Sequence, residues 1–189
     1  MLANITTSYL WFCLAFWVYL ETRNVGLTGL VNGLYMALVA VGSIFFGSVV
    51  DHHRKKTVMV IAAAATLVAF GLAALVWVLW VDPAQVRADD PAILAFAALV
   101  LVGAVVEQMR NVALSTTVTL MVPEAGRDKA NGLVGMVQGI AFFLTSVISG
   151  LSIGYLGMEI SLWIALGLTV LALVHLAPIR IAEAQIVTS

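Results

Sequence analysis

Residues 47–58 read GSVVDHHRKKTV and separate two long runs without charge, Gly29 to Val50 and Thr57 to Val81. The segment from Asp51 to Lys56 holds three of the nine basic residues of the chain. A helix of about 20 apolar residues crosses the hydrocarbon core at ~1.5 Å per residue, and a basic cluster between two such helices stays in the cytoplasm. This stretch therefore predicts two membrane-spanning helices and their orientation.

The composition excludes an ordinary soluble domain. Hydrophobic residues make up 62% of the chain and charged residues 10%, and the mean hydropathy is +1.08. Soluble domains usually carry roughly 25% charged residues. The nine basic residues are scattered among ten acidic ones, so no basic surface for nucleic acid is predicted. The lipid bilayer is the expected solvent.

Six apolar runs, of which only the fourth is interrupted by charged residues, give six expected spans, and no remaining stretch is long enough for a second domain. The sequence thus predicts an all-α integral membrane protein, with residues 1–189 forming one six-helix transmembrane bundle. The first run lacks a preceding basic residue and a following cleavage pattern, so we expect it to be retained as a helix. The expected spans are residues 1–20, 29–50, 57–81, 91–121, 130–158 and 160–179.

The basic residues lie mainly on one side of this predicted topology. One side carries Arg54, Lys55, Lys56, Arg127, Lys129 and Arg180. The opposite loops carry only Arg23 and Arg87. The positive-inside rule therefore predicts a multi-pass protein of the cell membrane with both termini in the cytoplasm.

The loop between the second and third runs resembles a signature of the major facilitator superfamily. That signature is a glycine, three small or apolar residues, an aspartate and a basic cluster that leads into the next helix. The matching residues are Gly47, Asp51, Lys55 and Lys56. His52 stands where the family usually has arginine, and Arg54 where it usually has glycine or an acidic residue.

A second stretch, residues 123–133 with the sequence PEAGRDKANGL, is similar to the loop between helices four and five of bacterial efflux-type members. The resemblance covers the chain as the amino-terminal half of a twelve-helix transporter. It implies a small, drug-like substrate that is exported by alternating access. The implied partner is a complementary six-helix half.

The resemblance also implies an inner gate, in which the loop with Gly47, Asp51, Arg54, Lys55 and Lys56 contacts the other half. Gly47 permits close helix packing, and Asp51 can accept hydrogen bonds from amides at a helix start. The alternative is a solvated loop that serves topology only.

Glu107 and Arg110 are charged residues within the fourth run, three positions apart and hence on one helix face. Ionisable residues inside a bilayer are costly and indicate function by default. Glu107 lies about 24 Å from Pro91 along a helix, which places the pair in the cytoplasmic half. The pair either lines a central cavity or provides a protonatable carboxylate that is coupled to transport. The alternative is a structural pair near the inner interface.

The fifth run predicts a smooth face for helix packing, because its small residues recur at spacings of four and seven. These residues are Gly135, Gly139, Ser146, Gly150 and Gly154. Weaker candidates for cavity lining, which could equally bond to their own backbone, are Thr6, Thr7, Ser8, Tyr9, Asn32, Tyr35, Gln138 and Ser149.

No cofactor, metal site or catalytic centre is predicted. The histidines His52, His53 and His175 lack further ligands at metal-binding spacing, and Cys13 lies alone in an apolar run. The chain has neither a Gly-x-Ser-x-Gly element nor a Gly-x-x-x-x-Gly-Lys loop, so we expect it not to be an enzyme. Three hypotheses follow: an amino-terminal transporter half, a self-sufficient six-helix transporter that forms homodimers, and a non-transporting membrane scaffold or remnant.

Overall fold

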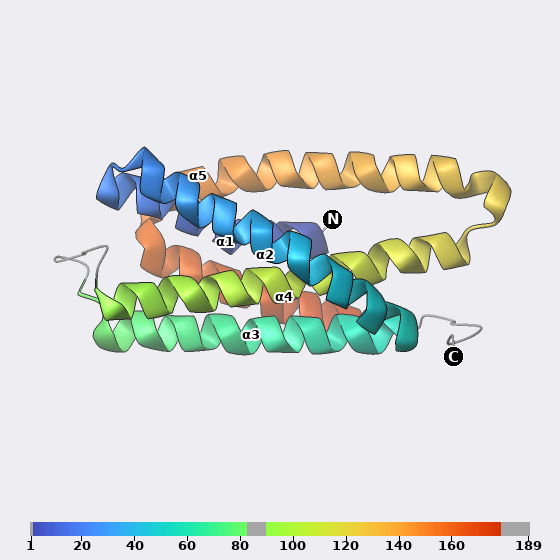
Figure 1. Cartoon of the computed structure of the whole chain (residues 1–189), viewed down its shortest axis with the longest axis horizontal. Helices are drawn as coiled ribbons and strands as arrows, with labels where there is room; N and C mark the ends of the chain where they lie inside the picture. Colours follow the sequence, from blue (N-terminus) through green and yellow to red (C-terminus); the bar gives the residue numbers. More distant parts are fainter. Residues whose placement is uncertain (1, 83–89, 179–189) are drawn as a thin grey trace.

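The computed structural model describes residues 2–82 and 90–178, and this part of the chain is a bundle of helices (Figure 1). Three residues that entered the topology prediction, Met1, Arg87 and Arg180, lie outside it, as does Ile179 at the end of the last expected span. The elements are α1 (Leu2–Thr22), α2 (Val25–His52), α3 (Lys55–Trp80), α4 (Pro91–Met121), the short 3-10 helix η1 (Glu124–Gly126) and α5 (Arg127–Leu176).

The long helix α5 consists of two segments. Its 50 residues would extend about 75 Å as one straight helix, more than twice the thickness of a hydrocarbon core. Gly157 interrupts it with φ 77° and ψ 179°, a conformation open essentially only to glycine. Figure 1 shows the chain turning back at this point, so residues 158–176 run beside the other helices. The charge pattern predicts this break at Glu159, but it occurs at Gly157.

By length and composition, four helices of the described chain could cross a membrane. They are α2, α3, the larger part of α4, and η1 together with α5. The last of these counts the two segments of α5 as one. Helix α1 has 21 residues, and its first half is rich in hydroxyl side chains; it is not among the four. The chain is thus a helical membrane protein, while the count of six spans stays a prediction.

Several helices extend beyond the charge-free runs, because backbone hydrogen bonding continues through charged and polar terminal residues. Helix α2 includes Asp51 and begins after Asn24, whose side-chain oxygen accepts the Leu27 N–H at 3.0 Å. Such a cap satisfies one of the unpaired amides at a helix start. Helix α3 likewise begins at Lys55, within the basic cluster.

The most extensive interface joins α3 to α4, and the next most extensive joins α1 to α5. At the first interface, the Thr66 hydroxyl donates to the Gly103 carbonyl at 3.2 Å. A Cβ atom at Gly103 would lie 2.5 Å from the Phe70 ring, so only glycine fits there without movement. Near one end of the bundle, the rings of Trp17, Trp77 and Phe96 pack edge to face or tilted.

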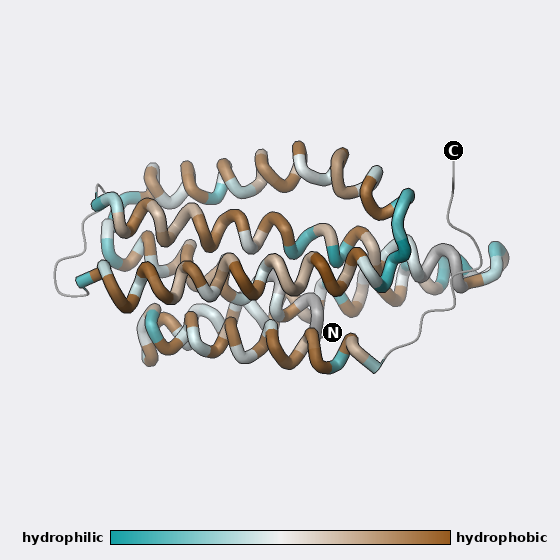
Figure 2. The backbone as a smooth tube through the Cα atoms, turned by 90° about the horizontal axis from the view of Figure 1, so that it is seen from below, coloured by the Kyte–Doolittle hydropathy of each residue, from teal (hydrophilic) through white to brown (hydrophobic). Residues whose placement is uncertain are grey.

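The connections gather at the two ends of the bundle (Figure 1). One end, called here the basic end, holds the α2–α3 loop, η1 and the end of α5, with Arg54, Lys55, Lys56, Arg127 and Lys129. The opposite, acidic end holds the α1–α2 turn, the end of α3, the start of α4 and Gly157, with Glu21, Asp82, Asp90 and Glu159. Figure 2 shows hydrophilic residues mainly at these ends and hydrophobic residues along the helices.

Candidate functional site

A polar cavity of about 290 Å³ lies between α1, α2, α4 and α5. Each of these four helices contributes two side chains to its wall. The lining residues are Ser8, Trp11, Tyr35, Met36, Gln108, Asn111, Gln138 and Phe142. The wall therefore combines hydroxyl and amide groups with aromatic and thioether groups, and none of the described residues in it is charged.

Hydrogen bonds hold two of the three amides of this wall. The Gln108 Nε2 group donates to the Tyr35 hydroxyl at 2.8 Å, and the Asn111 Nδ2 group donates to the Gln108 Oε1 atom at 3.1 Å. The Tyr35 ring stacks on Trp11, with centroids 4.0 Å apart and planes at 19°. This chain of contacts joins α1, α2 and α4, and it presents neutral hydrogen-bonding groups beside aromatic faces. Such a wall suits a small molecule that is partly apolar and carries polar groups.

Glu107 and Arg110 form an ion pair on α4, immediately behind the cavity wall. Their exposed fractions are 1% and 4%, so the pair is enclosed by the bundle. The Arg110 Nη2 group also donates to the Thr6 hydroxyl on α1. The adjacent residues Gln108 and Asn111 face the cavity, whereas the charged pair does not line it. The pair thus ties α4 to α1.

The α2–α3 loop is stabilised by Lys55, which is only 5% exposed. Its ammonium group donates to the carbonyls of Val50 at 2.6 Å and of Asp51 and His53 at 3.4 Å. A cation at the carboxyl end of a helix satisfies unpaired carbonyls and opposes the helix dipole. Asp51 does not cap the start of α3, the helix start that follows it in the chain. Helix α2 continues past Asp51, and Arg54 precedes α3 without a side-chain cap.

The remaining residues of the loop differ in their contacts. Lys56 donates to the Ala177 carbonyl at 2.9 Å, which connects the loop to the end of α5. Asp51 and Arg54 are exposed. A Cβ atom added at Gly47 would meet nothing within 4 Å, so the close approach expected there does not occur within the described part of this chain.

The small-residue face predicted on α5 is largely open. A Cβ atom at Gly135, Gly139 or Gly154 would meet nothing within 4 Å, and one at Gly150 would lie 3.6 Å from the Phe16 ring. Ser146 bonds to the Phe143 carbonyl of its own helix. Residues 2–82 and 90–178 therefore do not provide the packing predicted for most of this face.

A different face of α5 packs against α1. Its buried residues Ala141, Thr145, Ser149 and Ser152 are also small, at spacings of four, four and three. The Ser149 hydroxyl donates to the Tyr9 carbonyl at 3.1 Å, and the Cys13 thiol lies 4.0 Å from the Ser149 carbonyl. The sequence thus offers two small-residue faces on this helix, and the less glycine-rich of the two makes the contact with α1.

The weaker candidates divide into cavity residues and structural ones. Ser8, Tyr35 and Gln138 line the cavity. Asn32 bonds to the Thr28 carbonyl of its own helix. The side chain of Thr7 lies outside the described part of the structure. The sequence analysis did not identify Trp11, Gln108 and Asn111 as cavity residues. The position of two amides next to a charged pair in a membrane helix could have indicated that this part of α4 faces a polar cavity.

Comparison with known proteins identifies the family of this chain but finds no similar curated protein or solved structure. No curated protein and no solved structure matches the chain. The family model described as Major Facilitator Superfamily matches residues 1–186. This match covers nearly the whole sequence, including the four helices that surround the polar cavity. The chain belongs to the Major Facilitator Superfamily of membrane transporters.

Proposed function

We propose that this chain supplies one six-helix bundle of a secondary transporter, the amino-terminal one, which exports small, drug-like molecules across the cell membrane. In this proposal α5 provides two spans, divided at Gly157, and both termini are cytoplasmic. Support for the orientation comes from the basic end, where five lysines and arginines of the described residues gather.

The observation that carries the proposal is the incomplete wall of the polar cavity. Met36 and Phe142 line this cavity and yet are 60% and 56% exposed. Helix α2, which provides part of the wall, is the least buried of the four candidate spans. A second bundle placed over these residues would enclose the cavity. Substrate sites of such transporters lie between two repeats that rock against each other.

The cavity chemistry supports an amphipathic organic substrate. Amides at Gln108, Asn111 and Gln138 provide hydrogen bonds, while Trp11 and Phe142 provide apolar faces. The direction of transport rests on the resemblance of residues 123–133 to efflux-type members. Glu107 and Arg110 hold the wall in position in this proposal, since Arg110 pairs with Glu107 and donates to Thr6 on α1, and neither residue lines the cavity.

The α2–α3 loop is proposed as one side of the inner gate, and its residues have different roles there. Lys55 and Lys56 stabilise the loop within this chain. Asp51 and Arg54 are exposed and can reach a partner bundle. Gly47 and the open glycine face of α5 would then pack against helices of that partner.

Reconstitution tests whether the chain needs a complementary bundle for transport. The purified chain would be placed in proteoliposomes alone, as a crosslinked dimer, and together with the carboxy-terminal half of an efflux transporter of the same family, and ethidium transport would be followed by fluorescence. Transport only with the complementary half supports the proposal. Transport by the crosslinked dimer alone contradicts it and favours a homodimeric transporter. No transport in any arm contradicts it and favours a scaffold.

The cavity is tested by Gln108→Leu in the active assembly. This change removes both amide contacts of the wall, and we expect transport to fall about tenfold or more because one or two hydrogen bonds are lost. Ser43→Ala on α2 is the matched control, since the Ser43 hydroxyl donates to the Val39 carbonyl of its own helix. Equal transport by both variants would contradict a role of the cavity in substrate binding.

A further inference from the structure

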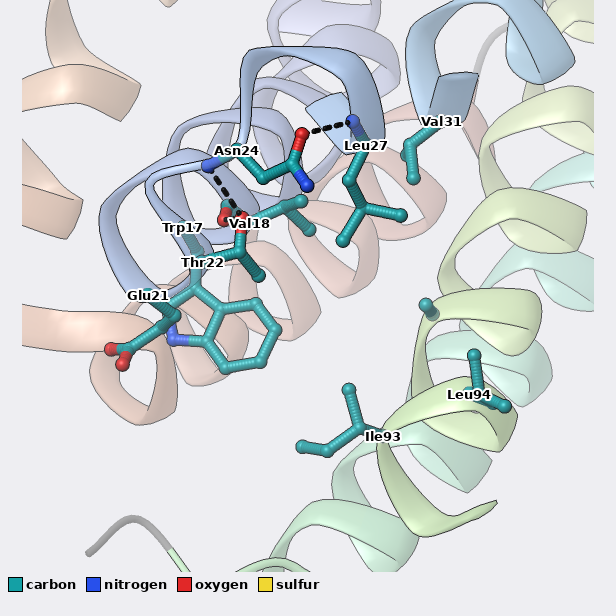
Figure 3. A pocket seen from close by; sticks show the side chains of 10 residues that line it. Trp17, Val18, Glu21, Thr22, Asn24, Leu27, Val31, Ile93 and Leu94 are labelled. Carbon is teal, nitrogen blue, oxygen red and sulfur yellow. Dashed lines mark hydrogen bonds between the residues drawn. The ribbon is translucent and has the colours of Figure 1, made fainter. Parts of the chain in front are cut away.

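Two adjoining pockets lie at the acidic end, away from the polar cavity and from the α2–α3 loop. Their volumes are about 330 Å³ and 300 Å³, and both are lined by Trp17 and Glu21 at the end of α1. The larger one, shown in Figure 3, is bounded by α1, the start of α2 and the start of α4. Apolar side chains such as Leu27 and Ile93 make up most of its wall.

The smaller pocket combines two indole rings with two carboxylates. Trp17 and Trp77 line it, and their centroids are 5.4 Å apart with planes at 73°. Both tryptophans are 5% exposed, so their rings are held firmly by the core. Glu21 from α1 and Glu159 from α5 also line this pocket, and both are exposed at its rim. Carboxylates and tryptophan faces both attract organic cations.

Trp17 adds an unused hydrogen-bond donor. Within residues 2–82 and 90–178 its indole N–H makes no hydrogen bond, and its nitrogen is not among the enclosed polar atoms of the bundle, although the residue as a whole is 5% exposed. The N–H group is therefore open to the pockets that Trp17 lines, where it can donate to water or to a ligand oxygen. In Figure 3 the indole nitrogen of Trp17 and the carboxylate of Glu21 lie at the same rim of the pocket. A ligand oxygen there would satisfy the donor.

We propose that these two pockets form one binding site for an amphiphile that carries an ammonium group. The ammonium group binds between Glu21, Glu159 and the tryptophan faces, an oxygen next to it accepts the Trp17 N–H, and the alkyl chain enters the larger pocket. A lipid headgroup of the phosphoethanolamine type and a free alkylammonium compound share this chemistry. The site uses none of the residues of the polar cavity, so it does not depend on the proposed transport function.

Binding is tested on the chain in phosphatidylglycerol nanodiscs, with tryptophan fluorescence as the readout and dodecyltrimethylammonium as the probe. The double variant Glu21→Gln/Glu159→Gln should bind this cation about tenfold more weakly, because two rim carboxylates are lost. Glu124→Gln is the matched control, since Glu124 is an exposed glutamate at the basic end, and it should bind as the unchanged chain does.

The Trp17 donor is tested separately with Trp17→Phe, which keeps an aromatic face and removes the N–H group. Its affinity for dodecylphosphocholine, which has phosphate oxygens, should fall about threefold to tenfold. Its affinity for dodecyltrimethylammonium, which has no oxygen, should change less than that. A loss of equal size for both probes would contradict the role of the N–H group.

Native mass spectrometry from nanodiscs with added phosphatidylethanolamine distinguishes a lipid headgroup from a free alkylammonium compound as the ligand. Retention of this lipid by the unchanged chain but not by the double glutamine variant supports the headgroup as ligand. Binding of dodecyltrimethylammonium without lipid retention supports a free alkylammonium compound. The proposal is overturned if the double variant binds the cation as the unchanged chain does, or if uncharged dodecyl maltoside binds equally well.

Discussion

Glycines lie within both α4 and the first segment of α5, but their surroundings differ completely. A Cβ atom at Gly103 in α4 would lie 2.5 Å from the Phe70 ring, while one at Gly139 in α5 would meet nothing within 4 Å. The α3–α4 interface is therefore filled, and the glycine face of α5 is open. A small residue therefore permits close packing without specifying which helix, or which molecule, provides the partner.

The largest expected effect is the loss of the buried ion pair on α4, the helix that also carries Gly103. Arg110→Met leaves Glu107 buried without its guanidinium partner, and we expect the free energy of unfolding to fall by about 3–5 kcal/mol. Unfolding in mixed micelles, followed by circular dichroism, measures this. The double variant Glu107→Gln/Arg110→Met should recover a large part of the loss, since it removes the uncompensated charge. No recovery would show that Arg110 acts mainly through Thr6.

Gly103→Val gives the next largest effect. The added side chain must displace Phe70, and such overpacking of a filled interface costs about 2–3 kcal/mol. Gly71→Val on the neighbouring helix α3 is the matched control, because a Cβ atom there meets nothing within 4 Å. Thermal unfolding of the two variants in detergent compares them directly. Equal stability would contradict the distinction between filled and open positions.

Gly157→Ala tests the turn at which the open segment of α5 ends. At φ 77° an L-residue is strained, so we expect a loss of about 1–2 kcal/mol although no atom obstructs the methyl group. Gly154→Ala, one turn earlier in regular helix, should be neutral or slightly stabilising. Chemical unfolding curves for the two variants give the difference, and an unchanged midpoint for Gly157→Ala would argue against a positive φ at this turn.

The smallest effect on folding is expected at the open face itself. Gly139→Leu should change the stability of the isolated chain by less than about 1 kcal/mol, because the site is exposed within this chain. Assembly with a complementary half should nevertheless weaken, as followed by co-purification. Leu133→Ala, an exposed change on the same helix, serves as a comparison for general loss of apolar surface. Unaffected assembly would mean that the partner covers another face.

Much of the helical architecture could be anticipated from the sequence, for a simple physical reason. Charge is so costly in a bilayer that loops such as Asp51 to Lys56 mark the helix ends. The i,i+3 spacing similarly predicted that Glu107 and Arg110 would meet. These are local properties of one segment, and a single sequence reports local properties well.

Contacts between distant segments could not be anticipated in this way. Thr6 reaches Arg110 across 104 positions, and Tyr35 meets Gln108 across 73. Which polar side chain faces the cavity depends on how each helix is rotated about its axis, and apolar residues surround most of each helix here. The charge pattern placed the turn at Glu159 rather than at Gly157, because glycine is frequent throughout the chain and only the backbone conformation distinguishes this one.

The bond from Lys56 to the Ala177 carbonyl has a consequence for mutational tolerance. Every amino acid at position 177 offers the same main-chain oxygen, so substitutions there should leave this bond intact. Position 56, in contrast, must supply a long side chain with a donor at its tip. The bond between the α2–α3 loop and the end of α5 therefore depends on the side chain at position 56 only. Sequence variation should be smaller at position 56 than at position 177.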